Sequence, residues 1–413
     1  MAAIDRSKQC VIIGGGPSGL MAAEQLCGAG YKVDLYDAMP TVGRKFLLAG
    51  LGGLNITHAE DCAGFSRRYA QDQKNLQAIL DDFTPDDLRT WCKELGIATF
   101  VGTSGRVFPE AMKAAPLLRA WLARLKTQGL TVYPKHRWSG WDESGSITLE
   151  SPTVAFSRPY DVLILALGGG SWKKLGSDGK WLPVLKSKGV SVAPLVSSNC
   201  GFLTDWSTHL KENYAGLPLK SVALSFKSTD GRHEKRLGEL ILTERGVEGS
   251  LIYAFSRRLR EAIEEMSEAT FYLDLCPNHS PEQLINVLKK KPRNKSLSTF
   301  LKTRLKQDAA KRALLFERLD KKDWDNTTSL VECLKNLPVT VTATTPIDEA
   351  ISTAGGVHFE ALSTDLMVKS LSGVFCAGEM VNWDAPTGGY LLTACFGMGR
   401  RAGLAASKYL ADS

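Results

Sequence analysis

Residues 10–20 of the chain read CVIIGGGPSGL, a short apolar run that passes directly into glycines. Apolar residues at helical spacing follow over 20–26, and residues 31–36 (YKVDLY) alternate as the residues of a strand do. The order strand, tight turn, helix and strand predicts a βαβ unit at the start of the chain.

The glycines of this turn have the spacing Gly-x-Gly-x-x-Gly. Gly14 permits the tight turn, Gly16 lets the backbone approach a pyrophosphate, and Gly19 lets the helix pack closely on the strand. The helix N-terminus supplies free N–H groups, and Ser18 adds a hydroxyl donor. Asp37 ends the next strand, where a carboxylate accepts hydrogen bonds from ribose hydroxyls. Because strand, helix and acid all stand in the required order, the motif predicts a dinucleotide site.

Two later apolar runs also end in glycine. Residues 161–167 (DVLILAL) precede three glycines at 168–170, and residues 373–377 (GVFCA) precede Gly378. Continuous apolar runs are typical of parallel strands that are covered on both faces. Because the last run lies more than 300 residues after the first, we expect the C-terminal part to complete one sheet around inserted material.

The middle of the chain has a different pattern. Short alternating segments such as 221–226 (SVALSF) and 271–275 (FYLDL) predict an antiparallel sheet or a small barrel. From about residue 280 to 337 the pattern is helical and polar, with Ser280 as a helix N-cap. The expected fold class is α/β: a Rossmann-like domain built from both chain ends, with an inserted antiparallel β-barrel and a helical subdomain.

The segment Gly378-Glu379 after the last strand favours FAD over NAD. It resembles a segment of glutathione-reductase-type flavoproteins, whose acid binds the ribityl chain that NAD lacks. The turn at Gly168 resembles one that lies near the adenosine half. A helix begins after Gly388-Gly389, and its positive end would face the flavin edge where negative charge accumulates. No second glycine fingerprint follows a strand, so NADPH or NADH, as a transient electron donor, would dock directly on the flavin.

Four blocks of sequence resemble the YhiN/BaiN-like family of bacterial flavoproteins. They are 43–50 (GRKFLLAG) with 55–58 (NITH), 105–109 (GRVFP) with 113–114 (KA), 353–357 (TAGGV), and 378–399. The resemblance implies an FAD domain at 1–190 and 341–413, a β-barrel-like domain at 191–278 and a helical basic subdomain at 279–340. The turn and the resemblance together assign to FAD binding Gly14, Gly16, Pro17, Ser18, Gly19, Asp37, Arg44, Lys45, Asn55, Gly168, Gly378, Glu379, Gly389, Tyr390 and Leu391.

The chain departs from the family at two places. The family commonly reads Gly-Gly-Arg-Cys-Asn where residues 51–55 read LGGLN, so Gly53 and Leu54 replace the arginine and the cysteine. The family's Thr-His pair in the barrel is Thr243-Glu244 here. The chain is therefore a divergent branch, and its substrate need not be that of its relatives.

The resemblance implies reduction of a ring conjugated to a carbonyl, such as uridine in ribosomal RNA or a steroid-like enone. Such a reaction needs a hydride from the flavin and an acid that protonates the adjacent carbon. Cys200 and His58 are candidates for the acid, and Arg106 is a candidate for holding a carbonyl or phosphate. The alternatives are a buried structural thiol, a loop histidine with local hydrogen bonds and an ion-pair arginine.

The net charge of +7 is concentrated in one segment, since residues 289–312 contain ten Lys and Arg residues and the single acid Asp308. This segment predicts a face that contacts the phosphates of structured RNA, although charge runs are usually solvated helix surface. Phe300 is the only aromatic residue in it, so a base-stacking platform is not indicated. The residues expected to contact RNA are Lys289, Lys290, Lys291, Arg293, Lys295, Lys302, Arg304 and Lys306.

Length and composition restrict the class of protein further. A chain of 413 residues, 44% hydrophobic and 23% charged, suits two or three globular domains. No apolar run is long enough for a membrane span, and the polar residues 1–10 do not resemble a signal peptide, so we expect a cytoplasmic protein. The nine cysteines include no Cys-x-x-Cys pair, so we expect neither a disulfide framework nor a metal site.

Two other functions remain open from the sequence. The first is a small-molecule flavin oxidase or hydroxylase. The second is a non-catalytic flavin-bearing protein that binds RNA or senses redox state.

Overall fold

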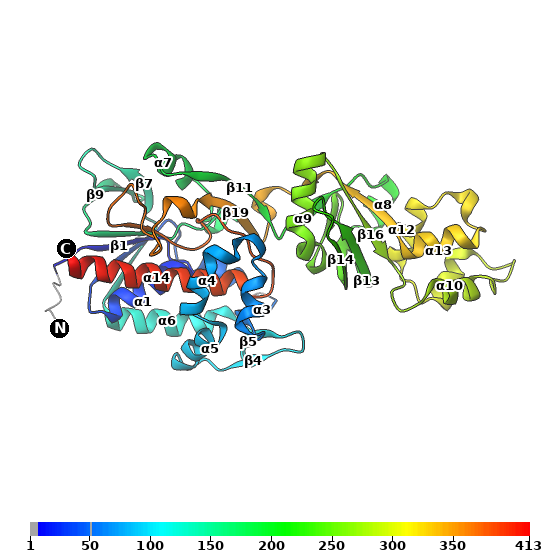
Figure 1. Ribbon diagram of the computed structural model, residues 1–413, viewed down its shortest axis with the longest axis horizontal. Coiled ribbons are helices and arrows are strands. Elements are labelled where there is room, and N and C mark those ends of the chain that lie inside the picture. Colours follow the sequence, from blue (N-terminus) through cyan, green and yellow to red (C-terminus); the bar gives the residue numbers. More distant parts are fainter. Residues whose placement is uncertain (1–6, 50–51) are drawn as a thin grey trace. The chain divides into compact units, whose positions relative to one another are not determined.

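The computed structural model describes residues 7–49 and 52–413 (Figure 1). Gly50, in a block that resembles the family, and Leu51, in the segment that departs from it, lie outside the described residues. The chain forms two compact units, one ending at Val196 and resuming at Ser352, the other spanning Ser197–Ile351. Each unit has its own hydrophobic core. The second unit ends beyond residue 340, because strands up to Thr344 still pair within its sheet.

A five-stranded parallel sheet forms the centre of the first unit, in the order β20-β10-β1-β2-β6. Its strands are β20 (Val374–Cys376), β10 (Val162–Leu165), β1 (Cys10–Ile13), β2 (Val33–Asp37) and β6 (Leu130–Pro134). Every residue of β1, β10 and β20 is buried, as expected for parallel strands covered on both faces. The predicted Rossmann-like sheet, completed by the C-terminal part of the chain, is therefore confirmed.

The turn after β1 passes very close to β10 and to the first helix. A Cβ atom at Gly14, whose φ is +101°, would lie 2.3 Å from the carbonyl oxygen of Ala166. A Cβ atom at Gly19 would lie 1.9 Å from the carbonyl oxygen of Gly14. Only glycine fits either position, and α1 (Pro17–Gly28) therefore begins directly at the end of β1 with proline in its first turn.

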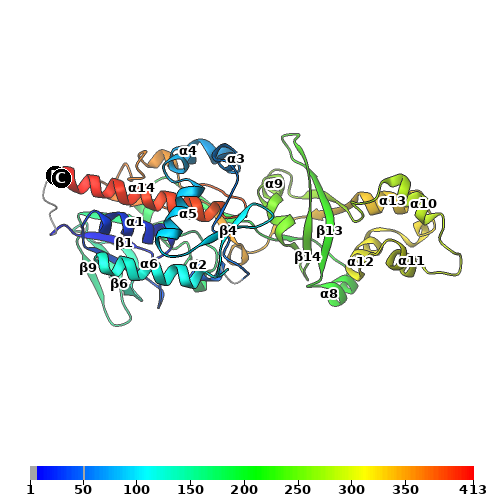
Figure 2. The same ribbon diagram turned by 90° about the horizontal axis from the view of Figure 1, so that it is seen from below.

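Helices α1 and α14 (Tyr390–Asp412) lie side by side, blue and red in Figures 1 and 2. A Cβ atom at Gly399 would lie 2.2 Å from the carbonyl oxygen of Ser18. The hydroxyl of Ser18 donates to the carbonyl oxygen of Cys395 at 2.8 Å. The two helices, far apart in sequence, thus pack with their backbones in contact.

The other elements of the first unit surround this core. A three-stranded antiparallel sheet lies on the opposite side of the central sheet from α1 and α6 (Figure 1), and consists of β7 (Arg137–Trp141), β8 (Ile147–Glu150) and β9 (Ala155–Arg158). Two small sheets comprise β3 (Thr57–His58), β5 (Arg106–Pro109) and β4 (Thr99–Val101), and β11 (Val192–Ser198) with β19 (Ser352–Val357). The helices are α2 (Arg44–Ala49), α3 (Cys62–Arg67), α4 (Gln73–Asp82), α5 (Pro85–Glu94), α6 (Ala114–Gln128) and α7 (Trp181–Ser187). No helix in the described part of the chain is long and apolar enough to cross a membrane.

The second unit contains a seven-stranded antiparallel sheet in the order β17-β16-β13-β14-β15-β12-β18. The two edge strands, β17 (Leu337–Val341) and β18 (Ala343–Thr344), are joined through Thr342, so the sheet curls until its edges meet, as in a small barrel. The predicted antiparallel sheet is confirmed. Its other strands are β12 (Phe202–Leu203), β13 (Pro218–Lys227), β14 (His233–Leu242), β15 (Gly246–Glu248) and β16 (Ala269–Asp274).

The helices of the second unit follow the polar pattern seen in the sequence. Ser280 caps α10 (Pro281–Leu288) in a capping box with Gln283, which confirms the predicted N-cap. Lys311 belongs to the basic run but is buried, and its ammonium donates to the carbonyl oxygens of Ser221 and Leu275. It is therefore part of the core and not of a charged surface. The remaining helices are α8 (Thr208–Tyr214), α9 (Ser250–Met266), α11 (Leu297–Arg304), α12 (Ala309–Arg318) and α13 (Thr327–Lys335).

We predict that Gly399→Val lowers the melting temperature of the protein by several degrees and releases FAD. The new side chain would collide with the backbone of Ser18, and overpacking of this kind costs about 1–3 kcal/mol. Gly28→Ala in α1 is the control, because a Cβ atom there meets nothing within 4 Å. Thermal melting followed by flavin fluorescence makes the comparison, and equal melting temperatures for the two variants would contradict the packing argument.

Candidate active site

A groove runs along the edge of the central sheet where β1, β2 and β10 end. Every residue that lines it belongs to the first unit. The carboxyl edge of a parallel sheet is the usual place for a nucleotide. Of the predicted FAD-binding residues, the groove brings together Gly14, Gly16, Pro17, Ser18, Asp37, Arg44, Lys45, Gly168 and Glu379.

The N-terminus of α1 opens onto one side of this groove. An added Cβ atom at Gly16 would meet nothing within 4 Å, in contrast to Gly14 and Gly19, so Gly16 leaves space where a phosphate would approach the first-turn N–H groups. Because the hydroxyl of Ser18 already donates to Cys395, Ser18 offers a phosphate its backbone N–H and not the hydroxyl donor expected from the sequence.

Asp37 lies at the end of β2, with its carboxylate held by the backbone. Its two oxygens accept from the N–H groups of Gly15, at 2.7 Å, and Met39, at 2.8 Å. Burial raises the pKa of Asp37, although these two hydrogen bonds and the nearby Arg137 and Arg44 partly oppose the increase. The carboxylate is thus fixed in the position where it would accept from ribose hydroxyls.

Three side chains of the groove contain a buried hydrogen-bonding atom that has no partner within residues 7–49 and 52–413. They are Nε of Arg44, the indole Nε1 of Trp138 and the hydroxyl of Ser177. Trp138 and Ser177 are both more than nine-tenths buried. Since buried polar atoms almost always have partners, these three fit a bound ligand rich in acceptors. A dinucleotide, with its phosphates, ribose and adenine, is such a ligand.

Lys45 and Glu379 form an ion pair at the other side of the groove. The Lys45 ammonium lies 2.8 Å from Oε2 of Glu379 and also donates to the hydroxyl of Ser171. The backbone N–H of Thr353 donates to the same carboxylate at 2.9 Å. Glu379 is 8% exposed, and a carboxylate buried to this extent needs such compensation.

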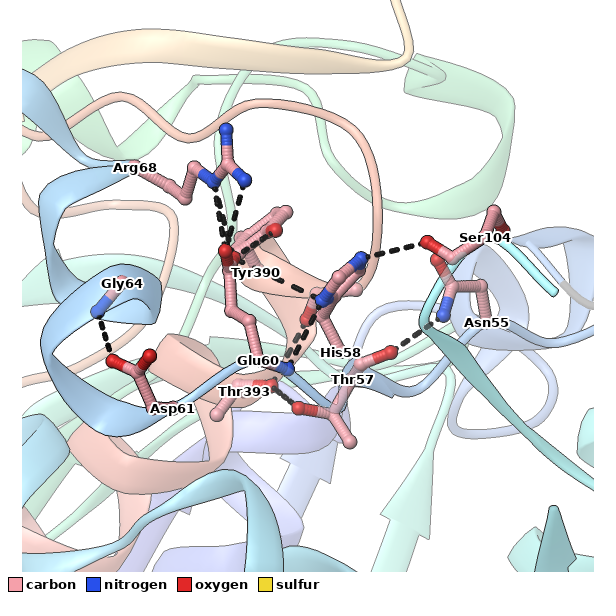
Figure 3. A network of polar contacts seen from close by, with 11 residues as sticks. Asn55, Thr57, His58, Glu60, Asp61, Gly64, Arg68, Ser104, Tyr390 and Thr393 are labelled. Atoms are coloured by element: carbon pink, nitrogen blue, oxygen red, sulfur yellow. Dashed lines mark hydrogen bonds and ion pairs between the residues drawn. The ribbon is translucent and has the colours of Figure 1, made fainter. Parts of the chain in front are cut away.

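The N-terminus of α14 lies in a polar network (Figure 3) and does not line the groove. The Tyr390 hydroxyl donates to Glu60, which also receives two N–H groups of Arg68. The amide nitrogen of Asn55 donates to the carbonyl oxygens of Thr57 and Val107. Five other predicted FAD ligands also lie outside the groove lining, namely Gly19, Gly378, Gly389, Tyr390 and Leu391.

The three predicted catalytic candidates lie in different surroundings. His58 Nε2 is 3.0 Å from the carbonyl oxygen of Ser104, while Nδ1 accepts from the N–H of Glu60, so both ring nitrogens have local partners. Cys200, in the second unit, is 1% exposed, with Sγ 3.3 Å from the hydroxyl of Ser256. The Arg106 guanidinium has no hydrogen-bond or ion-pair partner in the described part of the chain.

One cysteine lines the groove without having been singled out in the sequence. Cys395 follows the N-terminus of α14, and burial, together with the charge of Glu379, raises its pKa to about 12. The thiol therefore stays protonated at neutral pH. Among the described residues, no three His, Cys, Asp or Glu side chains come together in a way that would hold a metal ion.

The parallel sheet, the glycine turn at a helix N-terminus and the buried acid after β2 define a dinucleotide-binding fold, and the family to which the chain belongs makes it an FAD-dependent oxidoreductase. The chain belongs to the HI0933-like protein Rossmann domain family, whose model matches residues 8–405. This membership confirms the resemblance that the sequence blocks indicated.

The chain is similar over nearly its whole length to relatives with named activities. The 3-dehydro-bile acid delta(4,6)-reductase of Clostridium scindens is 24% identical over 413 residues, covering 96% of this chain and 98% of its own. The ribosomal RNA dihydrouridine synthase of Haemophilus influenzae is 24% identical over 398 residues, covering 92% and 94%. The solved 3-ketosteroid delta1-dehydrogenase of Sterolibacterium denitrificans shares the fold, with a TM-score of 0.54, 11% identity and coverage of 98% and 99%.

We predict that Trp138→Phe weakens FAD binding by about 2- to 10-fold, the usual contribution of one neutral hydrogen bond. Trp141→Phe is the matched control, because the Trp141 indole donates to the hydroxyl of Tyr160 and does not line the groove. Titration of the apoprotein with FAD measures both dissociation constants. If the two variants bind FAD equally well, the Trp138 indole does not contact the cofactor.

We also predict that FAD affinity decreases in acid and that Asp37→Asn abolishes this dependence. The ribose needs the ionised carboxylate as an acceptor, and the raised pKa of Asp37 means that the carboxylate becomes protonated at a higher pH than an exposed aspartate. Affinity is therefore retained above this pKa and lost as the pH decreases through it. At neutral pH the variant should bind about 10- to 100-fold more weakly, because hydrogen bonds to a charge contribute about 1.5–3 kcal/mol.

Titrations of both proteins from mildly acidic to neutral pH test this. Parallel pH profiles for the unmodified protein and Asp37→Asn would exclude Asp37 as the titrating group.

Proposed function

We propose that this protein reduces a carbon–carbon double bond conjugated to a carbonyl in a ring, with NADPH or NADH as the electron donor and uridine in structured RNA as the substrate. The observation that carries the proposal is the groove with its unpartnered donors and buried acid, in a chain whose full-length relatives include a reductase and an RNA dihydrouridine synthase by name.

The charge of the second unit supports RNA as the substrate. Lys289, Lys290, Arg293, Lys302, Arg304 and Lys306 are exposed, while Lys291 and Lys295 are half-buried. Lys291 lies 3.8 Å from Asp325, and Lys295 donates to the hydroxyl of Thr303. The six exposed side chains are therefore the ones expected to contact phosphates, and each neutralised phosphate contributes to a salt-dependent affinity.

Bound FAD supplies the two-electron chemistry, and the residues of the chain bind and orient it. Asp37 would accept from the ribose, the α1 N-terminus and Gly16 would receive the pyrophosphate, and Glu379 would accept from the ribityl chain. The ion pair of 2.8 Å with Lys45 holds the Glu379 carboxylate in place. Of Cys395, Cys200 and His58, only Cys395 lines the groove, so its thiol is the candidate proton donor that lies beside the cofactor site.

The test is an anaerobic reoxidation experiment on the holoprotein. The flavin is reduced with NADPH or NADH and then mixed with unmodified ribosomal RNA while its absorbance is followed. Fast reoxidation, with dihydrouridine detected in the recovered RNA, is the expected result. Reoxidation by a steroid-like enone but not by RNA would reassign the substrate to a small molecule. In a separate run with air admitted, reoxidation by oxygen but by neither RNA nor enone would indicate an oxidase.

A charge-reduced variant tests the docking face separately. Replacement of Lys302, Arg304 and Lys306 by alanine should weaken RNA binding and lower the slope of log affinity against log salt by about 0.7–0.9 for each lost phosphate contact. The same variant should reoxidise at an unchanged rate with a small enone. An unchanged salt slope would show that these side chains are ordinary solvated surface.

A further inference from the structure

The small sheet β3-β5-β4 of the first unit has two chemically different faces. Its register pairs His58 with Arg106 and Phe100 with Phe108. Directly paired residues of an antiparallel ladder project to the same face, as do residues two apart on one strand. His58, Arg106, Phe108 and Phe100 therefore share one face.

The opposite face of this sheet is buried against α14. Thr57 and Val107, paired in the register, are both fully buried. The hydroxyl of Thr393 in α14 donates to that of Thr57 at 2.8 Å (Figure 3). A Cβ atom at Gly389 would lie 2.5 Å from the backbone of Thr57. Because this face is fixed to the core, the face with the aromatic residues and Arg106 points outward.

The outward face presents an aromatic surface. Phe100 is 41% exposed and stacks on Phe108, with ring centroids 5.8 Å apart and an interplanar angle of 28°. An exposed ring that stacks on a second ring contributes little to a core and is typical of a binding surface.

Arg106 places a positive charge next to these rings. Its guanidinium has no ion-pair or hydrogen-bond partner within 7–49 and 52–413, whereas Arg68, on the far side of the polar network, is paired with Glu60. A planar guanidinium recognises phosphate with two parallel hydrogen bonds. An unpaired arginine beside stacked aromatic rings is a combination with which proteins bind single-stranded nucleic acid, the base on the ring and the phosphate on the cation.

We propose that the outward face of β3-β5-β4 binds one nucleotide of a single-stranded RNA segment, with the base stacked on Phe100 and the phosphate on Arg106. The proposal rests on the proposed function for its choice of RNA. This face supplies an exposed aromatic ring, which the basic segment 289–312 lacks. Phe300, the one aromatic residue in that segment, is 2% exposed and offers no ring for stacking.

The face is held in shape before any ligand arrives. The His58 ring contacts the hairpin loop through the Ser104 carbonyl and stacks on Tyr390 at 5.7 Å (Figure 3). A Cβ atom at Gly105 would lie 2.5 Å from this ring, so the loop lies directly against it. A preformed surface loses little conformational entropy on binding, and His58 acts here as a positioning residue for the hairpin.

The test is binding of a short fluorescein-labelled oligouridylate to the holoprotein, followed by fluorescence anisotropy at several salt concentrations. Arg106→Ala should lower the slope of log affinity against log salt by about 0.7, the contribution of one single-strand phosphate contact. Arg106→Lys should restore the slope. Phe100→Ala should weaken binding by about 5-fold or more, the usual effect of losing one base–aromatic stack.

Matched controls separate this site from general surface effects. Arg119→Ala removes an exposed arginine of α6, and Val154→Ala removes a side chain that is 57% exposed in the loop between β8 and β9. Neither should change the affinity or the salt slope. Flavin absorbance and melting temperature are measured first for each variant, so that loss of the fold is recognised.

A second measurement needs no variant at all. Photocrosslinking with a 4-thiouridine oligonucleotide should label a peptide that contains residues 99–109. Labelling that is confined to other peptides would overturn the proposed binding face. Suppose that the protein reduces uridine in RNA, but that Arg106→Ala and Phe100→Ala bind the oligonucleotide as tightly as the unmodified protein does. The proposed binding face is then wrong, and the proposed reductase function stands. Absence of any oligonucleotide binding by the unmodified protein would overturn this proposal, while reoxidation by RNA tests the function independently.

Discussion

The structure of the FAD-binding unit depends on close contacts among four backbone segments that have no side chains between them. The turn after β1 lies against β10 at Gly14 and against α1 at Gly19, and α1 in turn lies against α14 at Gly399. Each position leaves less than 3 Å for a Cβ atom, so any other residue would push two elements apart. The groove exists because these elements meet so closely at one edge of the sheet.

Close packing at this edge also places backbone N–H groups where they hold the carboxylates of the groove. Asp37 and Glu379 are both poorly exposed, and both are held by backbone N–H groups, with Lys45 added at Glu379. Carboxylates fixed in this way accept hydrogen bonds without reorganising. The unpartnered atoms of Trp138 and Ser177 lie on the same groove, so it combines fixed acceptors with open donors.

The sequence predicted those parts of the site that are contiguous in the chain. The fingerprint Gly14, Gly16 and Gly19 and the acid Asp37 follow one another at fixed spacing, and the βαβ unit was predicted from them. Glu379 was found through the apolar run before it. Each of these residues belongs to a local motif, and local motifs are visible without knowledge of tertiary contacts.

The remaining parts depend on contacts between distant segments. Trp138 lies on β7 and Ser177 after β10, and nothing at either position indicates that both face one groove. The ring of His58 was expected to be free for catalysis or locally bonded, and only the structure places Ser104 and Glu60 on its two nitrogens. Lys311 belongs to the charge run in sequence and yet is buried, because α12 turns it toward the sheet.

The first unit is built from two distant stretches of the chain, and this determines when it can fold during synthesis. A ribosome completes the glycine turn and Asp37 early, and then makes the entire second unit, Ser197–Ile351, before it reaches Glu379 and α14. Domains generally fold as units during synthesis, so the inserted unit can fold while the first unit still lacks β19, β20 and α14. Cofactor capture is therefore among the last steps of maturation, and a nascent chain that stalls within the insert carries a folded charged unit without a flavin site.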